Sequence, residues 1–412
     1  MNLFLTKLFD WSYLFVVKKI VFNTPPDKAH DQTLKFAKWS GKIGFLQWLL
    51  RVFTKYEKPE LETNVMGIDF KNPIGLGAGL DKNAAMGECL ENCGFGHATF
   101  GSITGRQSIG NPKPWFHRLP KYQSMMVWVG LANKGVDELG PHIANCNDKS
   151  KTMNVCASIA RTNDKLAADE TEGIADYVKS FVSLKDSVKF IEVNISCPNT
   201  FKGEPFTTPK SLDKLLSELD KVERSIPITL KMPQDKTDAE FKELLDVILK
   251  HNVQGVTIAN LRKDREGLEV PTDWNGNLSG TPTHKRALEL VTLAYEHTHN
   301  KVVSESSLMI DGKNVTPDNG KLAIIGLGGV MNSDDAYEFV KAGADLVEFV
   351  SALMYKGPAV VSLIKRGLVK SLKADGFANI KDAVGSGVSG VSSGASGSED
   401  GAASSEDSGV SN

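Results

Sequence analysis

The segment FIEVNISCPNT, residues 190–200, joins a run of strand-forming residues to a tight polar cluster. Its first half carries β-branched and aromatic residues, which favour a buried strand. Its second half places Cys197 directly before a proline and between Asn194 and Asn199. A buried strand that ends in polar side chains is typical of a parallel barrel, where the carboxyl ends of the strands carry the chemistry.

The same unit of strand and polar loop recurs along the chain. Between the short apolar runs lie helical patterns such as SLDKLLSELDKVERS, residues 211–225, whose apolar positions recur every three or four residues. Eight strands alternating with helices predict an α/β fold, a (β/α)8 TIM barrel, rather than a doubly wound sheet. The predicted strands are residues 73–78, 97–101, 154–158, 189–195, 226–231, 255–259, 322–326 and 345–350.

Composition limits the class of protein. The chain has 412 residues, of which 41% are hydrophobic and 24% charged, and this suits one large domain with extensions. The net charge of −2 offers no basic footprint, so nucleic-acid binding is not expected. Five cysteines form an odd count, which favours a reducing compartment. Cys89 and Cys93 lie four apart without a second Cys/His pair, so we predict packing and no metal site.

The first 60 residues differ from the rest in charge and hydropathy. Residues 1–60 hold ten Lys/Arg against five Asp/Glu, together with many large apolar side chains. Charges between positions 7 and 19 interrupt the first apolar run, so we expect no spanning helix. The pattern predicts two short amphipathic helices carrying Trp11, Trp39 and Trp48, which would lie in a membrane interface. The alternative is a helical hairpin packed on the protein's own core.

The last residues are different again. Residues 385–412 contain ten Ser, seven Gly, four acidic residues and no Lys or Arg. Such a composition cannot bury a core, so a disordered tail is predicted. The expected domains are therefore a helical segment over residues 1–60, a barrel over 61–384 and the tail over 385–412.

Lysines, amides and glycines follow the predicted strands and would converge on one face of the barrel. Such a set predicts a site for an anionic, hydrogen-bonding ligand. The motif GLGG, residues 326–329, resembles the phosphate grip that the last loops of many barrels form with backbone N–H groups. Each glycine alone could serve an ordinary tight turn. With Lys231 and Asn194 on the same face, the set predicts a phosphorylated cofactor.

Six motifs, in the same order, resemble those of the dihydroorotate dehydrogenases, above all the class 2, membrane-bound, quinone-dependent branch. The similarity runs from about residue 20 to residue 385. The motifs are NPIGLGAGLDKN (72–83), FGSITGRQSIGNPKPWFHRLP (100–120), VNISCPNT (193–200), LKMP (230–233), NLSGTP (277–282) and IIGLGGV (324–330).

The resemblance implies FMN as cofactor, dihydroorotate as substrate, orotate as product and a membrane quinone as electron acceptor, in pyrimidine (UMP) synthesis. It also implies that residues 1–60 bind the lipid surface, at the cytoplasmic face of a membrane. The implied flavin contacts are Gly77, Ala78, Gly79, Asp81, Ser102, Ser158, Asn194, Lys231, Gly280, Gly328, Gly329 and Ser351. The implied substrate contacts are Lys82, Gly130, Leu131, Asn199, Thr200 and Asn260. His30 and Arg118 match positions on the quinone route, although His30 could equally be a satisfied histidine between helices.

In this family the residue before the proline is the general base, and here it is Cys197. Oxidation of dihydroorotate requires a proton to leave C5 while a hydride leaves C6. Class 2 members usually have serine at this position, and class 1 members have cysteine. A thiol has an ordinary pKa of about 8.5, so a modest depression would make it a base near neutral pH. The alternative for Cys197 is an inert buried cysteine.

Several departures from class 2 leave other readings open. Val127 stands where an asparagine that holds the substrate is expected, and Ser158 replaces a flavin-binding asparagine. Ala259 and Val350 replace a threonine and a tyrosine. The change at Val127 bears on the substrate more than on the flavin. The alternatives are a soluble acceptor such as fumarate or NAD, another dihydropyrimidine-like substrate, or a flavin-binding scaffold without turnover.

Overall fold

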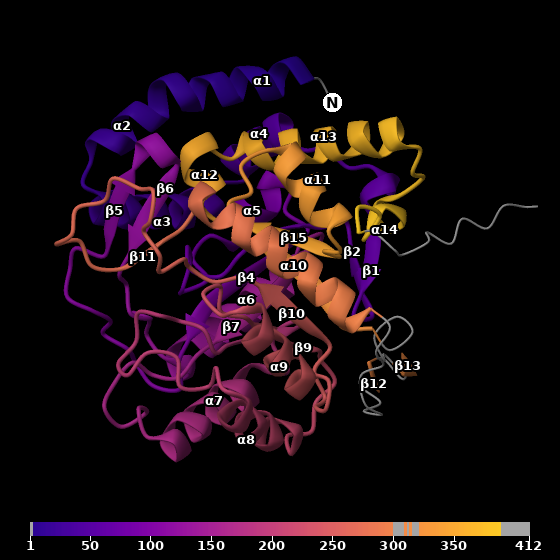
Figure 1. Cartoon of the computed structure of the whole chain (residues 1–412). Helices are drawn as coiled ribbons and strands as arrows, with labels where there is room; N and C mark the ends of the chain where they lie inside the picture. Colours follow the sequence, from indigo (N-terminus) through magenta and orange to yellow (C-terminus); the bar gives the residue numbers. More distant parts are fainter. Residues whose placement is uncertain (1–2, 300–308, 311–312, 315–320, 389–412) are drawn as a thin grey trace, which may run out of the picture.

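A closed barrel of eight parallel strands forms the centre of the molecule (Figure 1). The computed structural model describes residues 3–299, 309–310, 313–314 and 321–388. Strand order around the barrel follows the chain, and the last strand pairs with the first. All eight predicted strands are confirmed, as β3 (Ile74–Leu76), β4 (His97–Ile103), β7 (Asn154–Ile159), β8 (Ile191–Asn194), β9 (Ile228–Lys231), β10 (Gly255–Ile258), β14 (Ala323–Leu327) and β15 (Leu346–Phe349).

Amphipathic helices surround the barrel. In α8 (Pro209–Asp220) the leucines recur every three or four positions, and all of them are buried. Side chains cap several helix starts. Asp169 accepts from two backbone N–H groups of α7 (Glu170–Leu184), and Thr237 forms a capping box with Glu240 in α9 (Asp238–Ile248). The helices are α5 (Gly87–Cys93), α6 (Val136–Lys149), α7 (Glu170–Leu184), α8 (Pro209–Asp220), α9 (Asp238–Ile248), α10 (His284–Thr298), α11 (Ser333–Lys341), α12 (Ser351–Lys356), α13 (Ala359–Asp375) and α14 (Ile380–Ala383).

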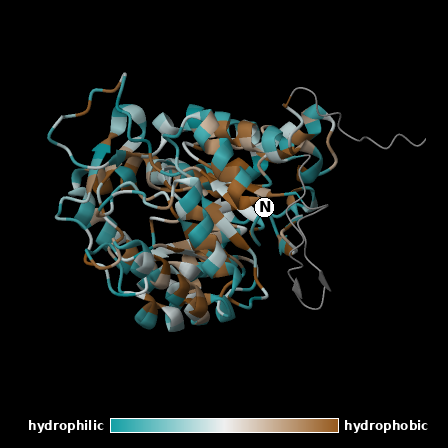
Figure 2. Ribbon diagram, turned by 60° about the horizontal axis from the view of Figure 1, so that its bottom comes forward, coloured by the Kyte–Doolittle hydropathy of each residue, from teal (hydrophilic) through white to brown (hydrophobic). Residues whose placement is uncertain are grey.

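The two ends of the barrel are covered differently. A hairpin of β1 (Thr63–Val65) and β2 (Ile68–Phe70) closes the end where the strands begin, and Phe70 packs there in one buried cluster with Phe190. Near the other end lies a three-stranded antiparallel sheet of β5 (Phe116–Leu119), β6 (Ser124–Val127) and β11 (Asn277–Leu278). Hydrophilic residues dominate the outer loops (Figure 2). The site therefore forms at the second end, between the strand termini and the antiparallel sheet.

The N-terminal helices lie across one side of the barrel domain. The first helical stretch comprises α1 (Leu3–Ser12), the π-helical turn η1 (Tyr13–Val17) and α2 (Lys18–Asn23). It runs over α13 and over a later helix, α4 (Gly44–Thr54) (Figure 1). Then follow α3 (Pro26–Gly41) and α4 (Gly44–Thr54). Three stretches form where two were predicted, because a turn at Lys42–Ile43 divides the second. Among the described residues no helix combines the length and hydropathy that crossing a membrane requires.

Short elements complete the described part of the chain. Three 3-10 turns, η2 (Pro59–Leu61), η3 (Pro120–Tyr122) and η4 (Thr281–Thr283), link larger elements, and β12 (Met309–Ile310) pairs with β13 (Lys313–Asn314). Gly385 and Gly387 donate backbone hydrogen bonds to Val340 and Lys341, so the barrel domain's packing continues to residue 388. The rest of the predicted tail lies outside the described residues.

Candidate active site

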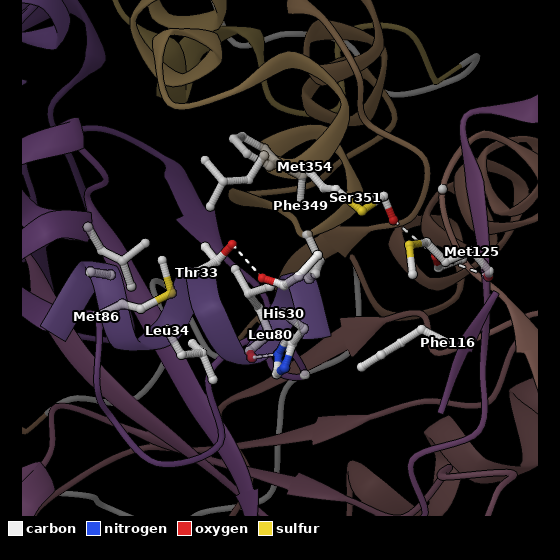
Figure 3. A pocket seen from close by; sticks show the side chains of 18 of the residues that line it. His30, Thr33, Leu34, Leu80, Met86, Phe116, Met125, Phe349, Ser351 and Met354 are labelled. Atoms are coloured by element: carbon white, nitrogen blue, oxygen red, sulfur yellow. Dashed lines mark hydrogen bonds between the residues drawn. The ribbon is translucent and has the colours of Figure 1, made fainter. Parts of the chain in front are cut away.

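A continuous cavity of about 830 Å³ runs from the N-terminal helices to the carboxyl ends of the barrel strands. Figure 3 shows its helical part, where Leu34, Phe116 and Met354 surround His30. At the barrel end the lining includes Lys231. Of the predicted site residues, all but four line this cavity; the four are Gly77, Asp81, Ser158 and Thr200. The fold thus brings together residues that are far apart in sequence.

The four remaining residues lie outside this lining, and their ligand contacts stay predictions. The Asp81 carboxylate is buried and accepts from the backbone N–H of Met86 at 2.7 Å. The Ser158 hydroxyl lies 2.8 Å from that of Ser102. The Thr200 hydroxyl donates to the Gly203 carbonyl oxygen at 2.6 Å and lies 3.2 Å from that of Cys197. A side chain at Gly77 would meet the barrel interior, with its Cβ 3.0 Å from a methyl of Leu327.

Bare backbone and hydroxyl groups form one part of the barrel end. A Cβ added to Gly328 would lie 2.6 Å from the Cβ of Ala287, so this position has no room for a side chain. Gly79 is different, because it has a φ of +127° and an added Cβ would meet nothing within 4 Å. It therefore presents bare backbone to the cavity. At the start of α12 the Ser351 hydroxyl lies 3.0 Å from that of Ser279. These groups suit a ligand that approaches the backbone closely.

A buried cation and a chain of amides form the rest of that end. Lys231 closes β9, and its Nζ lies 3.5 Å from a carboxylate oxygen of Glu192. Burial raises the pKa of Glu192, while the Lys231 charge opposes that shift. The Asn194 amide donates to Ser102 at 2.8 Å, and the Asn260 amide donates to Asn194 at 3.2 Å. These hydrogen bonds fix the orientations of both amides.

Lys82 and Cys197 both line the cavity, and burial shifts the pKa of each. Burial lowers the pKa of Lys82 to about 8, and its ammonium donates to the Gly79 carbonyl oxygen at 2.5 Å. Burial raises the pKa of Cys197 to about 11, although the charges of Lys82 and Lys231 act in the opposite direction. The expected depression of the thiol pKa is therefore wrong in direction, because desolvation outweighs the two nearby cations.

Asn199 is held by partners that sequence reasoning missed. Its side-chain amide donates to the Val127 carbonyl oxygen at 2.9 Å, and its side-chain oxygen accepts from Asn277 at 2.6 Å. Its backbone carbonyl accepts from Asn111 at 2.9 Å. Both asparagines lie within motifs that the sequence offers, GNPKP and NLSGTP, but nothing local indicates that they reach the same loop.

The two residues predicted on the quinone route lie at the helical end of the cavity. His30 donates from Nε2 to the Leu80 carbonyl oxygen at 2.8 Å (Figure 3), and burial lowers its pKa. Its partner is thus a loop of the barrel domain, not a neighbouring helix. Arg118 donates to the carbonyl oxygens of Val21 and Thr24 at 3.0 and 2.7 Å, which ties the end of α2 to β5.

Comparison with known families and proteins agrees with this geometry. The family model described as dihydroorotate dehydrogenase matches residues 60–304 and 314–372. A protein named dihydroorotate dehydrogenase (quinone) from Halobacterium salinarum is 30% identical over 373 residues, covering 90% of this chain and 99% of the relative. One of the same name from Methylobacillus flagellatus is 32% identical over 364 residues, covering 86% and 98%.

Solved structures show the same fold. The crystal structure of DHODH from Eimeria tenella in complex with ferulenol matches with a TM-score of 0.73 at 26% identity, covering 89% of this chain and 98% of the other. The ligand-free type from the same organism matches with a TM-score of 0.69 at 27% identity, covering 88% and 99%.

Proposed function

The chain belongs to the dihydroorotate dehydrogenase family, and we infer from this premise that it oxidises dihydroorotate to orotate in pyrimidine synthesis. FMN is the hydride acceptor, and a quinone is the final electron acceptor. The observation that carries this inference is the single cavity that joins Lys82, Cys197 and Lys231 to an apolar mouth among the N-terminal helices.

The residues at the barrel end fit FMN. Bare backbone at Gly328 and the hydroxyl of Ser351 suit the phosphate, and Asn194 and Ser102 supply hydrogen bonds for a ring. Lys231 is a buried cation, and the carboxylate of Glu192 lies 3.5 Å from its Nζ. At that distance the Lys231 charge can also interact with a bound ring. When bound, FMN supplies a hydride acceptor for C6 of the substrate. A cation at this position would stabilise negative charge on the ring.

The lining formed by Lys82, Cys197, Asn199 and Asn260 suits dihydroorotate and its proton transfer. Lys82 provides positive charge for the substrate carboxylate, and the amides of Asn199 and Asn260 match the ring's N–H and C=O groups. Cys197 is the proposed base, and its thiolate would take the proton from C5. Because the Cys197 thiol has a raised pKa, only a small fraction is thiolate at neutral pH.

The helical end of the cavity suits the electron acceptor. Its lining there is largely apolar and includes Phe9, Leu50 and Phe53 of the N-terminal helices. A quinone with an apolar tail would reach this mouth from a lipid surface, and large side chains such as Trp11, Trp39 and Phe45 are exposed on the same helices. We therefore propose that residues 1–60 bind peripherally to the cytoplasmic face of a membrane. This apolar route favours a quinone over fumarate or NAD as acceptor.

A spectroscopic experiment tests the proposed function. Purified protein should show flavin absorption, and anaerobic dihydroorotate should bleach it; added quinone should then restore the colour. A colourless protein that takes up no FMN would contradict the flavoprotein assignment. A yellow protein that dihydroorotate leaves unbleached would point to another substrate, and one that fumarate or NAD reoxidises faster than quinone would point to another acceptor.

A further inference from the structure

Asn277 lies in register with Val127, the position at which the expected substrate-binding amide is missing. Antiparallel strands β6 and β11 pair Val127 with Asn277 and Met126 with Leu278. Residues directly opposite each other in an antiparallel pair project from the same face of the sheet. Val127 lines the cavity. Asn277 thus brings a side-chain amide to the face that lacks one at Val127.

This amide acts on Asn199. Asn277 Nδ2 donates to Asn199 Oδ1 at 2.6 Å, while Asn199 Nδ2 donates to the backbone oxygen of Val127 at 2.9 Å. Val127 and Asn277 therefore both bind the Asn199 side chain, Val127 at its amide nitrogen and Asn277 at its amide oxygen. An asparagine side chain has two N–H donors and two lone pairs on its oxygen. One N–H group and one lone pair of Asn199 remain for a ligand.

Only one amide orientation satisfies both partners. Rotating the Asn199 amide by half a turn would place its oxygen against the Val127 carbonyl and its NH2 group against that of Asn277. Asn199 lines the cavity beside Cys197. A fixed donor and acceptor, side by side, match a ring edge that carries adjacent C=O and N–H groups.

We propose that Asn277 is a positioning residue that fixes the Asn199 amide toward the cyclic amide edge of the substrate, and so compensates for the amide absent at Val127. The proposal rests on the function inferred above, and it deepens that function by naming a determinant of substrate recognition. Asn277 acts through Asn199 and need not touch the substrate.

Calorimetric titration of the FMN-loaded enzyme with orotate tests this role. Asn277→Ala should raise the dissociation constant of orotate about two- to tenfold, the usual range for one lost hydrogen bond. Asn277→Asp should raise it more than Asn277→Ala, because a carboxylate facing Asn199 Oδ1 favours the wrong amide orientation. In turnover, KM for dihydroorotate should rise while KM for quinone stays at the parent value.

Two further variants separate positioning from mere structure. Val127→Asn in the Asn277→Ala background restores an amide to the same cross-strand pair, so it should recover part of the orotate affinity. Asn154→Ala removes another half-buried amide, which donates to the Asp69 carbonyl oxygen at 2.9 Å at the far end of the barrel, and it should leave orotate binding unchanged.

Each outcome decides between the claims. Parent-like orotate affinity in both Asn277 variants would overturn the positioning role. So would a loss of affinity that tracks a lower melting temperature, with no recovery on adding Val127→Asn. If the parent enzyme itself retains FMN but does not bind orotate, the proposed function fails, and this inference fails with it for a distinguishable reason.

Discussion

At the scale of single residues, burial and charge compete at Cys197. Two lysines lower the pKa of its thiol, but burial raises it further, to about 11. The thiol keeps its proton until the pH rises well above neutral, and each pH unit below 11 costs about tenfold in thiolate. Lys82 changes in the opposite sense, because burial lowers its pKa to about 8. The pair therefore resists charge separation in the ligand-free cavity.

The pH dependence of substrate oxidation follows from this. At saturating dihydroorotate, the flavin reduction rate should keep rising with pH through pH 9, because the thiolate fraction grows until the pH reaches about 11. Cys197→Ala should lower the rate about 10²- to 10⁴-fold, the usual contribution of a positioned base. Stopped-flow absorbance measures both effects. A reduction rate that levels off near pH 7 would show that bound substrate lowers the pKa of Cys197 again.

A matched cysteine serves as the control for that experiment. Cys146 is also half-buried with a raised pKa, but it lies against Gly87 outside the cavity lining. Cys146→Ala should reduce its flavin at the parent rate. If Cys197→Ala does so as well, the base lies elsewhere.

Sequence alone could predict the residues that follow the barrel strands, and little more of the site. Asn194 and Lys231 end their strands and Ser351 follows β15 by two residues, so the barrel topology is enough to gather them. Asn277 was missed because its role depends on the register of β11 against β6, which brings together residues 150 positions apart. Asp81 shows a second limit of the sequence, because a polar residue after a strand can also bind the backbone of its own loop, as its carboxylate does at Met86.

At the scale of elements, the number of strands and their alternation with helices predicted the barrel, because each strand has its own run of hydrophobic residues. The N-terminal helices were harder to predict. Their amphipathic pattern is plain, but the partner of the apolar face is not. In the structure, α1 contacts α4 and α13 while Trp39 and Trp48 are 55% and 56% exposed. The packed hairpin and the lipid-binding surface, posed as alternatives, are thus compatible.

Removing exposed aromatics from these helices tests the membrane proposal. The double variant Trp39→Ser with Trp48→Ser should weaken co-sedimentation with anionic phospholipid vesicles at least tenfold. Burying each indole in the lipid surface would contribute about 1.5–3 kcal/mol to the binding free energy. Reduction by dihydroorotate should be unaffected. Leu166→Ser is the matched control, since Leu166 is equally exposed on a loop of the barrel domain. Unchanged vesicle binding by the double variant would contradict the proposal.

At the scale of the whole molecule, a buried lysine joins two helices that surround the barrel, α13 and α5. Lys365 is buried, and its ammonium donates to the Gly94 carbonyl oxygen at 2.7 Å, at the end of α5. The same oxygen accepts from Asn72 at 3.2 Å. Burial lowers the pKa of Lys365 to about 8 from an ordinary value of 10.5. The folded state therefore holds this proton less tightly than the unfolded chain does.

Stability should depend on pH accordingly. Below pH 8 Lys365 is protonated in both the folded and the unfolded state, so the full cost of burying its charge is subtracted from the free energy of unfolding. Between about pH 8 and 10.5 the unfolded state binds more protons, so this cost disappears as the pH rises. Lys365→Met should therefore stabilise the FMN-loaded protein at pH 7 by about 1–3 kcal/mol, since Gly94 keeps its bond from Asn72.

Denaturation at two pH values measures this effect. The advantage of Lys365→Met in urea should be present at pH 7 and largely lost at pH 10, where the parent lysine is neutral in the folded state. Lys370→Met alters an exposed lysine of the same helix, so its effect should be small and similar at both pH values. If Lys365→Met destabilises the protein equally at both, the hydrogen bond to Gly94 outweighs the burial of charge, and Lys365 contributes net stability between α13 and α5.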